Sequence, residues 1–372
     1  MTAPIAPPGL AGLVVTDTAI GDVRGQEGFF HYRGHNATQL ARTCSLEEVW
    51  HLLAVGHLPD DVEVKAFTER LAGWRDRLPA DLLARTRAAT RAGTEPLTAL
   101  RTAWSDAATP LGVRPWLDLD PAQRLDQALG LAAIGPVLVA AGHRDGVADE
   151  LAATPTSTAA AYLRLLTGAT PPVAHVRALE RYLVATIDHG LNASTFTARV
   201  VASTGADLAA VLVAGLGALS GPLHGGAPSR ALDMLDAIGT ADRAEGWLNN
   251  AIGRGERIMG FGHRIYRTED PRATLLRETA RELGGGRVEL ALSVEATAKA
   301  VLRAHKPDRV LDVNVEYWAA IVLDAVGVPR ELFTPTFAVS RAIGWMAHAL
   351  EQTEGNRIIR PSSRYVGPAP TG

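Results

Sequence analysis

The pattern of apolar and polar positions along the chain predicts a protein built mainly of helices. Ala, Leu, Arg and Glu predominate, and alternation of β-branched residues is scarce. "SLEEVWHLLAVGHLP" (45–59) begins with Ser45 and carries Glu48 three residues later, which is a capping-box pattern, and a glycine and a proline end the helix. "DPRATLLRETARELGGG" (270–286) has Asp as N-cap, Pro at the first helical position and a glycine stop.

Three more segments are interpreted as helices because they are long and apolar. "TPTFAVSRAIGWMAHALEQ" (334–352) repeats the start with Pro. Positions 315–326 are apolar nearly all round and end at Gly327, which is typical of a buried helix. "LGLAAIGPVLVAAG" (129–142) is shorter than the roughly 20 residues that a bilayer-spanning helix needs, so it too is interpreted as a buried helix.

Strand patterns are confined to the N-terminal region. "GLVVTDTAIGDV" (12–23) and "GFFHYRG" (28–34) alternate weakly, so we expect a small sheet there at most. The expected fold class is therefore all-α. The Pro/Thr-rich stretch 153–160 is expected to be a loop, and the Gly-rich break at 221–226 and the turn at 327–329 are the expected domain hinges.

Composition narrows the class of protein. With 372 residues, 47% of them hydrophobic and 21% charged, the chain is long enough for two domains and reads as an ordinary soluble protein. The net charge of -3 indicates neither a nucleic-acid partner nor an anionic membrane. Cys44 is the only cysteine, which excludes a disulfide framework within the chain and fits a reducing cytoplasm. The first ten residues lack the features of a signal peptide.

Candidate chemistry is concentrated in three segments where polar residues sit beside glycines, between long apolar helices. They are 188–200, 215–232 and 255–273, and each contains a histidine next to a glycine. Glycine lets a backbone approach a ligand closely, and histidine can present a ring nitrogen near neutral pH. A single histidine of this kind is more often structural than catalytic.

The remaining histidines are interpreted as structural or surface residues: His31, His35, His51, His57, His143, His175 and His305. His348 follows Arg341 by seven residues and could share its helix face, but core packing is the simpler interpretation. Metal-binding patterns such as His-Glu-x-x-His or an Asp-rich calcium loop do not occur. "GPLHGGA" lacks the Gly-Lys-Ser/Thr ending of a phosphate loop. The chain also lacks the alternating strands that a Rossmann fold requires.

The order of the polar segments resembles the citrate synthase family. "DHGLNASTFTARVVASTGADL", "GALSGPLHGGA", "IMGFGHRIYRTEDPRA" and "NVEYWAAIVLDAVGVPRELFTPTFAVSRAIGW" follow one another as in that family. "GLVVTDTAIGDVRGQEGFFHYRGHNATQLA" and "NRIIRPSSRYVGP" are similar to its short bacterial form. The resemblance covers nearly the whole chain and is weakest from about 60 to 180, where only "TEPLTALRTAWS" (94–105) matches a family segment.

The resemblance implies a two-domain helical enzyme that acts as a homodimer. The large domain would hold residues 1–224 and would be completed by 327–372, and the small domain, 225–326, would close over the active site. Closure of this kind excludes water before the reaction.

The resemblance also implies catalytic roles. His224 in "GPLHGG" would hydrogen-bond the thioester oxygen of acetyl-CoA and stabilise its enol, and His263 in "GFGHR" would polarise the ketone of oxaloacetate. Glu316 stands where the family places its catalytic base. Arg264 and Arg267 lie where basic residues meet the phosphates of CoA.

A second group of residues would hold oxaloacetate. The resemblance assigns its carboxylates to His189, Arg272 in "DPRA" and Arg341 in "VSRAIGW". Arg360 in "IIRPSS" matches an arginine that the family supplies from the partner subunit, and Asn192 is a supporting position. A dicarboxylate needs fixed cationic partners of this kind, because arginine binds carboxylates as a bidentate fork.

One departure from the family concerns the base itself. The usual pattern is Asn-Val-Asp, and this chain has Asn314-Val315-Glu316. Glutamate adds one methylene, about 1.5 Å of bond length, and a displacement of about 1 Å can cost about a hundredfold in rate. Trp318 and Ala319 replace smaller or more polar neighbours of the family's "NVDFYSG". Because the whole turn has changed, we expect compensation and not decay.

The expected reaction joins acetyl-CoA, oxaloacetate and water to give citrate and CoA, with no metal or redox cofactor. The nearest alternative is a 2-methylcitrate synthase that uses propionyl-CoA, which differs by one methylene, worth about 1–3 kcal/mol of discrimination. A low-activity or regulatory paralogue that binds CoA or dicarboxylates is a second alternative. A helical scaffold protein is a third, which would leave the Gly-flanked polar loops unexplained.

Overall fold

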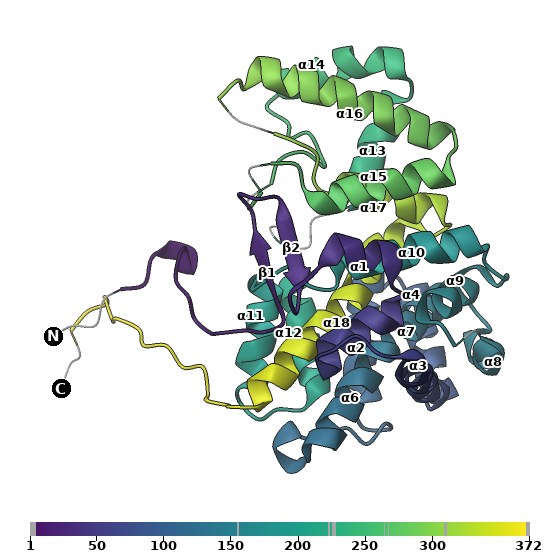
Figure 1. The fold of residues 1–372 in the computed structure, drawn as a ribbon, viewed down its shortest axis with the longest axis vertical. Helices are drawn as coiled ribbons and strands as arrows, with labels where there is room; N and C mark the ends of the chain where they lie inside the picture. Colours follow the sequence, from purple (N-terminus) through teal and green to yellow (C-terminus); the bar gives the residue numbers. More distant parts are fainter. Residues whose placement is uncertain are drawn as a thin grey trace.

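Two groups of helices make up the protein (Figure 1). The computed structural model describes residues 5–154, 156–221, 224, 228–263, 265–266, 268–308 and 311–369. The larger group consists of α1 Ala37–Thr43, α2 Leu46–Val55, α3 Asp61–Asp76, α4 Ala80–Arg91, α5 Pro96–Ala107, α6 Pro121–Ala133, α7 Gly135–His143, α8 Val147–Glu150, α9 Thr158–Thr167, α10 Val173–Thr186, α11 Ala193–Ala202, α12 Leu208–Leu219 and α18 Phe333–Thr353.

The smaller group forms the upper part of Figure 1. It consists of α13 Pro228–Ile238, α14 Ala244–Gly253, α15 Pro271–Leu283, α16 Gly286–His305 and α17 Val315–Ala325. Helix α10 of the larger group packs against both α15 and α17 and so joins the two groups. The division into a large and a small domain, with boundaries at 224/225 and 326/327, stays a prediction. Short 3₁₀ turns complete the fold: η1 Pro8–Leu10, η2 Trp116–Asp118, η3 Leu151–Ala153, η4 Ala241–Arg243 and η5 Arg330–Leu332.

The prediction of an all-α fold with a small N-terminal sheet is confirmed. Strands β1 Gly21–Arg24, β2 Phe29–Tyr32 and β3 His35–Asn36 form one antiparallel sheet in that order, with Gly21 opposite Tyr32. The strand predicted for 12–23 was too long, because its first part has no neighbouring strand to pair with. Val14, for example, is 81% exposed.

Helix starts with a local capping signal were predicted well. Ser45 and Glu48 form the expected capping box of α2, and Gly56 ends that helix in the left-handed conformation. Asp270 caps α15. Helix α18 begins at Phe333, one residue before the predicted start, so Pro335 lies in its first turn. A proline is tolerated there because a first-turn N–H has no partner within the helix.

The apolar stretch at 129–142 is divided between α6 and α7. Together, residues 121–143 are long and apolar enough to cross a membrane by length and composition, but 83% of their most apolar window is buried inside the protein. That burial is typical of a core helix pair. The loop predicted at 153–160 ends earlier, because α9 begins at Thr158, whose N–H donates to Glu47 Oε1; Pro155 lies outside the described residues.

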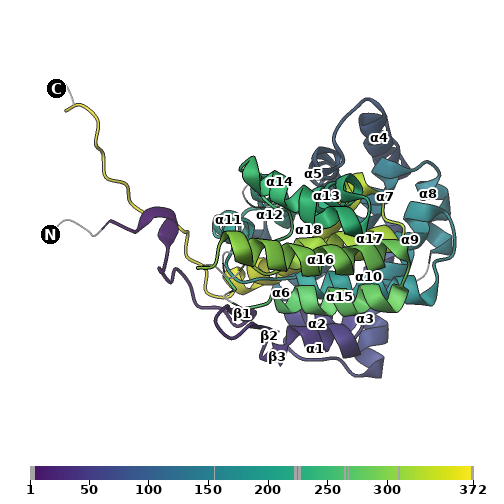
Figure 2. The same cartoon turned by 90° about the horizontal axis from the view of Figure 1, so that it is seen from above.

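The two ends of the chain leave the body on the same side as extended segments (Figures 1 and 2). Both carry exposed apolar side chains, among them Ile5 (63%), Val14, Ile358 (62%) and Val366 (81%). Extended segments with apolar side chains on their surface are suited to packing against another protein chain.

Candidate functional site

Two of the predicted histidines, His189 and His263, lie together in a buried aromatic cluster. Their ring centroids are 5.9 Å apart. The Tyr266 hydroxyl lies 3.0 Å from His189 Nε2, and Phe30 of β2 contacts the other side of the His189 ring at 5.8 Å between centroids. Burial, together with the positive charge of Arg272, lowers the pKa of His189 well below its usual value, so this imidazole is neutral.

The main chain determines which nitrogen of His263 carries the proton. The N–H groups of Ile265 and Tyr266 both donate to His263 Nδ1, each at 2.9 Å. Because Nδ1 accepts, the neutral ring carries its proton on Nε2. Burial and the neighbouring Arg272 lower the pKa of His263 to about 4, so the ring is neutral at pH 7. Arg272 Nη2 lies 3.3 Å from Nε2, and therefore two N–H donors face the same space.

Arg272 is held by a carboxylate two residues before it. Asp270 Oδ1 accepts from Arg272 Nε at 3.0 Å, and Asp270 Oδ2 accepts from Nη2 at 2.8 Å. Both side chains are buried, with Asp270 at 1% and Arg272 at 4% exposure. Burial alone would lower the pKa of Arg272, but the Asp270 charge outweighs it and the pKa is raised. The result is a fixed cation inside the protein.

Arg341 approaches the same cluster from α18. Its Nε donates to the carbonyl oxygen of Thr186 at 2.9 Å, and its guanidinium lies over the ring of Phe337, 4.7 Å from the centroid. Burial lowers the pKa of Arg341, and the nearby Asp188 carboxylate opposes that change. Arg341 and Arg272 both lower the pKa of His189, so the three predicted oxaloacetate ligands of this chain share one electrostatic environment.

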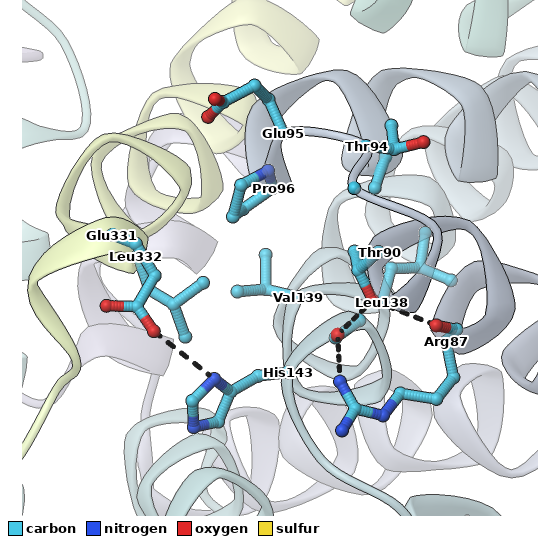
Figure 3. A pocket seen from close by; sticks show the side chains of 13 residues that line it. Arg87, Thr90, Thr94, Glu95, Pro96, Leu138, Val139, His143, Glu331 and Leu332 are labelled. Atoms are coloured by element: carbon cyan, nitrogen blue, oxygen red, sulfur yellow. Dashed lines mark hydrogen bonds and ion pairs between the residues drawn. The ribbon is translucent and has the colours of Figure 1, made fainter.

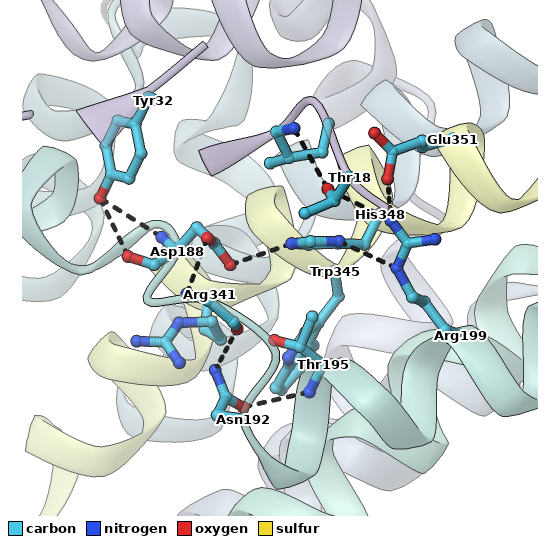
Figure 4. A network of polar contacts seen from close by, with 12 residues as sticks. Thr18, Tyr32, Asp188, Asn192, Thr195, Arg199, Arg341, Trp345, His348 and Glu351 are labelled. Carbon is cyan, nitrogen blue, oxygen red and sulfur yellow. Dashed lines mark hydrogen bonds and ion pairs between the residues drawn. The ribbon is translucent and has the colours of Figure 1, made fainter. Parts of the chain in front are cut away.

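A buried polar network holds the segment that carries His189 (Figure 4). Asp188 accepts hydrogen bonds from His348 Nε2 at 3.2 Å and from Gly190 N at 3.0 Å. His348 Nδ1 accepts in turn from Arg199 Nε at 3.1 Å, and Arg199 is ion-paired with Glu351. His348 is buried, as expected for core packing, and it also links α18 to the start of the binding segment.

His224 faces the N-terminal end of α11. Ser194 Oγ lies 2.8 Å from His224 Nε2, and the Ser194 N–H donates to the same nitrogen at 3.2 Å. Nε2 is therefore an acceptor, and the proton of the neutral ring is on Nδ1. Burial and the positive charge of Arg341 lower the pKa of His224. Trp345 Nε1 donates to Ser194 Oγ at 3.2 Å, which fixes the serine from α18.

Asn192 caps α11, and its supporting role at the site stays a prediction. Its Oδ1 accepts from the N–H groups of Ser194 and Thr195, both at 3.1 Å, and so caps α11. Its Nδ2 donates to the Gly190 carbonyl at 3.2 Å. Asn192 thereby connects the His189 segment to the helix whose first turn contacts His224.

A short pair of extended segments connects His263 to Glu316. Asn314 N donates to Gly260 O at 2.8 Å, and Gly262 N donates to Asp312 O at 2.7 Å. Asn314 also caps α17 by accepting the N–H of Glu316. His263 and Glu316 therefore come directly after two segments that are hydrogen-bonded to each other.

Burial raises the pKa of Glu316 above its ordinary value, and the positive charges of Arg272, Arg257 and Arg230 oppose that change. Among the described residues, no hydrogen bond or ion pair holds its carboxylate. A half-buried carboxylate with raised pKa near several arginines can accept a proton from a bound ligand. The position of its carboxylate thus depends on how α17 is placed.

The prediction of CoA-binding residues rests on two arginines. Arg264 and Arg267 lie outside the described residues. A hollow of about 350 Å³ beside His263 is lined by two other cationic residues, Arg257 and Lys306, which could meet an anionic ligand. The sequence reasoning did not single out either residue.

Arg360 does not join the other predicted residues of its own chain. It is exposed and lies in the extended segment after α18. That segment contacts the body at Ser203, whose Oγ accepts the N–H of Ile359 at 3.0 Å. Its predicted role in the site of a partner subunit stays a prediction.

Other hollows and polar clusters of the described residues do not include the predicted site residues. A hollow of about 250 Å³ is lined by Arg87, Glu95, His143, Glu331 and neighbouring side chains, none of which is a predicted site residue (Figure 3). Two groups have metal-binding side chains close together: His51, His57 and Glu63, and Glu269, Glu295 and Asp312.

Sequence reasoning missed several residues that hold the predicted ones in place. Tyr266 contacts His189, Ser194 contacts His224, and Asp188 organises the binding segment. Asp270 was recognised as a helix cap but not as the partner of Arg272. All four lie inside the motifs already quoted, so their position beside the predicted ligands was the available signal.

The chain is similar to known proteins over most of its length. The sequence matches the family profile "Citrate synthase, C-terminal domain" over residues 9–362. A Mycobacterium tuberculosis protein named putative citrate synthase 2 is 39% identical over 368 residues, covering 98% of this chain and 93% of the relative. A 2-methylcitrate synthase of Shewanella oneidensis is 33% identical over 376 residues, covering 97% and 95%.

A solved structure agrees in fold over the full length. The citrate synthase of Thermoplasma acidophilum, in a ternary complex with carboxymethyl coenzyme A and oxaloacetate, has a TM-score of 0.86 at 27% identity. The match covers 100% of this chain and 98% of that one.

Proposed function

The chain belongs to the citrate synthase family, and on this premise we propose that it condenses acetyl-CoA with oxaloacetate and hydrolyses citryl-CoA to citrate and CoA. The observation that carries the proposal is the state of His224 and His263. Each is a neutral imidazole with one nitrogen occupied by main-chain N–H donors, and so each keeps the other N–H for a substrate oxygen.

Oxaloacetate is bound by the buried cations. Arg272 and Arg341 supply fixed positive charge for its two carboxylates, and His189 adds a neutral polar contact. Arginine matches a carboxylate with two parallel hydrogen bonds, and buried arginines lose little freedom on binding. His263 directs its Nε2–H at the ketone oxygen, where negative charge develops in the condensation.

Glu316 removes a proton from the methyl group of the thioester. His224 donates its Nδ1–H to the thioester oxygen and stabilises the enol that forms. The enol carbon then attacks the ketone carbon, and His263 stabilises the alkoxide. Water finally cleaves the citryl thioester to release CoA. Carbon–carbon bond formation with thioester hydrolysis involves no net oxidation or reduction, so the proposal needs no redox cofactor.

Propionyl-CoA is the alternative donor. The relative from Shewanella oneidensis is named 2-methylcitrate synthase, and the two donors differ by one methylene, worth about 1–3 kcal/mol in an apolar pocket. We propose acetyl-CoA as the main substrate because the Mycobacterium tuberculosis relative named putative citrate synthase 2 is 39% identical to this chain, and the 2-methylcitrate synthase is 33% identical.

A thiol-release assay distinguishes the two donors. Purified protein is incubated with oxaloacetate and either acetyl-CoA or propionyl-CoA, and free CoA thiol is measured over time. We expect a higher kcat/KM with acetyl-CoA. A higher value with propionyl-CoA would assign the chain to the alternative, and no release with either would overturn the proposed function.

Glu316→Gln tests the base. The amide keeps the size of the side chain but cannot accept the methyl proton, so thiol release should fall by about 10² to 10⁴. Oxaloacetate binding, measured by calorimetry, should change little because the arginines are untouched. Near-normal turnover of this variant would remove Glu316 from the mechanism.

The pH dependence of kcat should also follow Glu316. The base must be ionised, and its pKa is raised by burial, so activity is present at neutral pH and is lost as the pH falls through this raised pKa. Both catalytic histidines have lowered pKa values and stay neutral further into acid. Glu316→Asp should therefore shift the midpoint of the acid limb. An unchanged midpoint would assign the limb to another group.

We propose a homodimer in which Arg360 completes the site of the partner subunit. The exposed Arg360 on an extended segment, and the apolar side chains exposed on both terminal segments, support this arrangement. In such a dimer each site takes Arg341 from one chain and Arg360 from the other.

Hybrid dimers test the exchange. Arg360→Ala and Arg341→Ala chains are co-expressed with different tags, and the heterodimer is purified through both tags. One of its two sites then has both arginines, so about half of wild-type turnover is expected, while each variant homodimer is impaired. If Arg360 served its own subunit, both sites would lack an arginine and the heterodimer would be as impaired as the homodimers.

A further inference from the structure

Helix α17 is anchored on the side that faces away from the site. The indole Nε1–H of Trp318 donates to Glu295 Oε2 of α16 at 3.0 Å. Both side chains are buried, with Trp318 at 0% and Glu295 at 4% exposure. Beside them, the hydroxyl of Tyr317 donates to the carbonyl oxygen of Ala291 at 2.7 Å. Two successive side chains of α17 are thus hydrogen-bonded to α16.

Helix geometry relates this anchor to the base. Residues two apart on an α-helix point about 200° away from each other, so Trp318 and Glu316 project from nearly opposite sides of α17. A hydrogen bond from Trp318 to α16 therefore fixes the rotation of α17, and with it the direction in which Glu316 projects. The Glu316 carboxylate has no holding contact of its own among the described residues.

The same glutamate also connects to the segment that leads into α17. Glu295 Oε1 lies 2.7 Å from both Arg277 Nη1 and Lys299 Nζ. Lys299 reaches on to Asp312 Oδ1 at 2.6 Å. Asp312 belongs to the extended pair that precedes the cap of α17. One buried carboxylate therefore restrains both the face and the beginning of the helix.

The acidic cluster of Glu269, Glu295 and Asp312 is not argued to be a metal site. Arg277 and Lys299 already pair with these three carboxylates. Its charges are balanced by side chains, and its geometric consequence is the connection of α15, α16 and α17.

We propose that the hydrogen bond from Trp318 to Glu295 is a positioning contact that sets α17 so that the glutamate at position 316 reaches the substrate methyl group. Trp318 and Glu295 touch neither substrate nor the reacting atoms and act only through the placement of Glu316. The inference rests on the proposed function of Glu316 as the base.

A double-mutant cycle tests this contact. Trp318→Phe removes the indole N–H, and it is made both in the native chain and in Glu316→Asp. With the glutamate present, kcat for thiol release should fall by about tenfold or more, because a displacement of about 1 Å can cost about a hundredfold. The KM for oxaloacetate should stay within about threefold, because its arginine ligands do not depend on this contact. With the aspartate present, the further loss should be less than about twofold.

Matched variants separate positioning from general damage. Trp247→Phe makes the same change in the partly buried Trp247 of α14 and should leave kcat within about twofold in both backgrounds. Glu295→Gln keeps an oxygen acceptor for Trp318 but weakens the ion pairs with Arg277 and Lys299, so its loss of kcat should be smaller than that of Trp318→Phe. If Trp318→Phe fails to fold, as judged by thermal unfolding, Glu295→Leu removes the acceptor instead and takes its place in the cycle.

The outcomes are distinct. Equal fold losses from Trp318→Phe with glutamate and with aspartate at position 316 would overturn the inference, because they would show a general structural effect. A loss that appears only with the glutamate supports it. No thiol release by the native chain with either acyl-CoA would instead overturn the proposed function, and the inference would fall with it.

Discussion

The carboxylate of Asp270 is the constraint on which the rest of the site depends. Its two oxygens accept two hydrogen bonds from the Arg272 guanidinium, one from the Arg272 main chain and one from Val315 N at the start of α17. Removing one partner of a buried ion pair typically costs about 3–5 kcal/mol, because the other charge is left uncompensated. The same side chain caps α15, so one residue connects the start of α15, the Arg272 guanidinium and the helix that carries Glu316.

Burial and positive charge together set the protonation states in the site. Arg272 and Arg341 both lower the pKa of His189, Arg272 lowers that of His263, and Arg341 lowers that of His224. Neutral imidazoles can donate a hydrogen bond without adding charge, which is what a polarised carbonyl requires. For Glu316 the same field has the opposite benefit: burial raises its pKa, and the arginines oppose that rise, so the base remains ionisable.

How much the sequence could predict depends on the range of each interaction. The caps of α2 and α15 were predictable because Ser45 and Asp270 bond to groups within three residues. The first predicted strand was too long, because strand formation needs a neighbour that the local pattern does not reveal. Strand β1 starts at Gly21 because its pairing with β2 begins there, opposite Tyr32.

The site residues were identified through motifs, but the contacts between the motifs were not. Tyr266 meets His189 across 77 positions, and His348 meets Asp188 across 160. Periodicity shows that such residues are buried, but it does not show which buried partner they meet. The bond from Trp318 to Glu295 belongs to this class: the sequence predicted a buried helix around Trp318, and only the packing of α16 shows which side chain its indole N–H meets.

The extra methylene of Glu316 can be accommodated by two rigid movements of α17, and the anchor discriminates between them. With Cα atoms at about 2.3 Å from the helix axis, moving one Cα by about 1.5 Å along its circle needs a rotation of about 40°. That rotation would turn the Trp318 indole by the same angle and break its bond to Glu295. A shift of about 1.5 Å along the axis equals the rise of one residue and preserves the face of every side chain. The hydrogen bond from Trp318 to Glu295 therefore opposes the rotation more strongly than the shift along the axis.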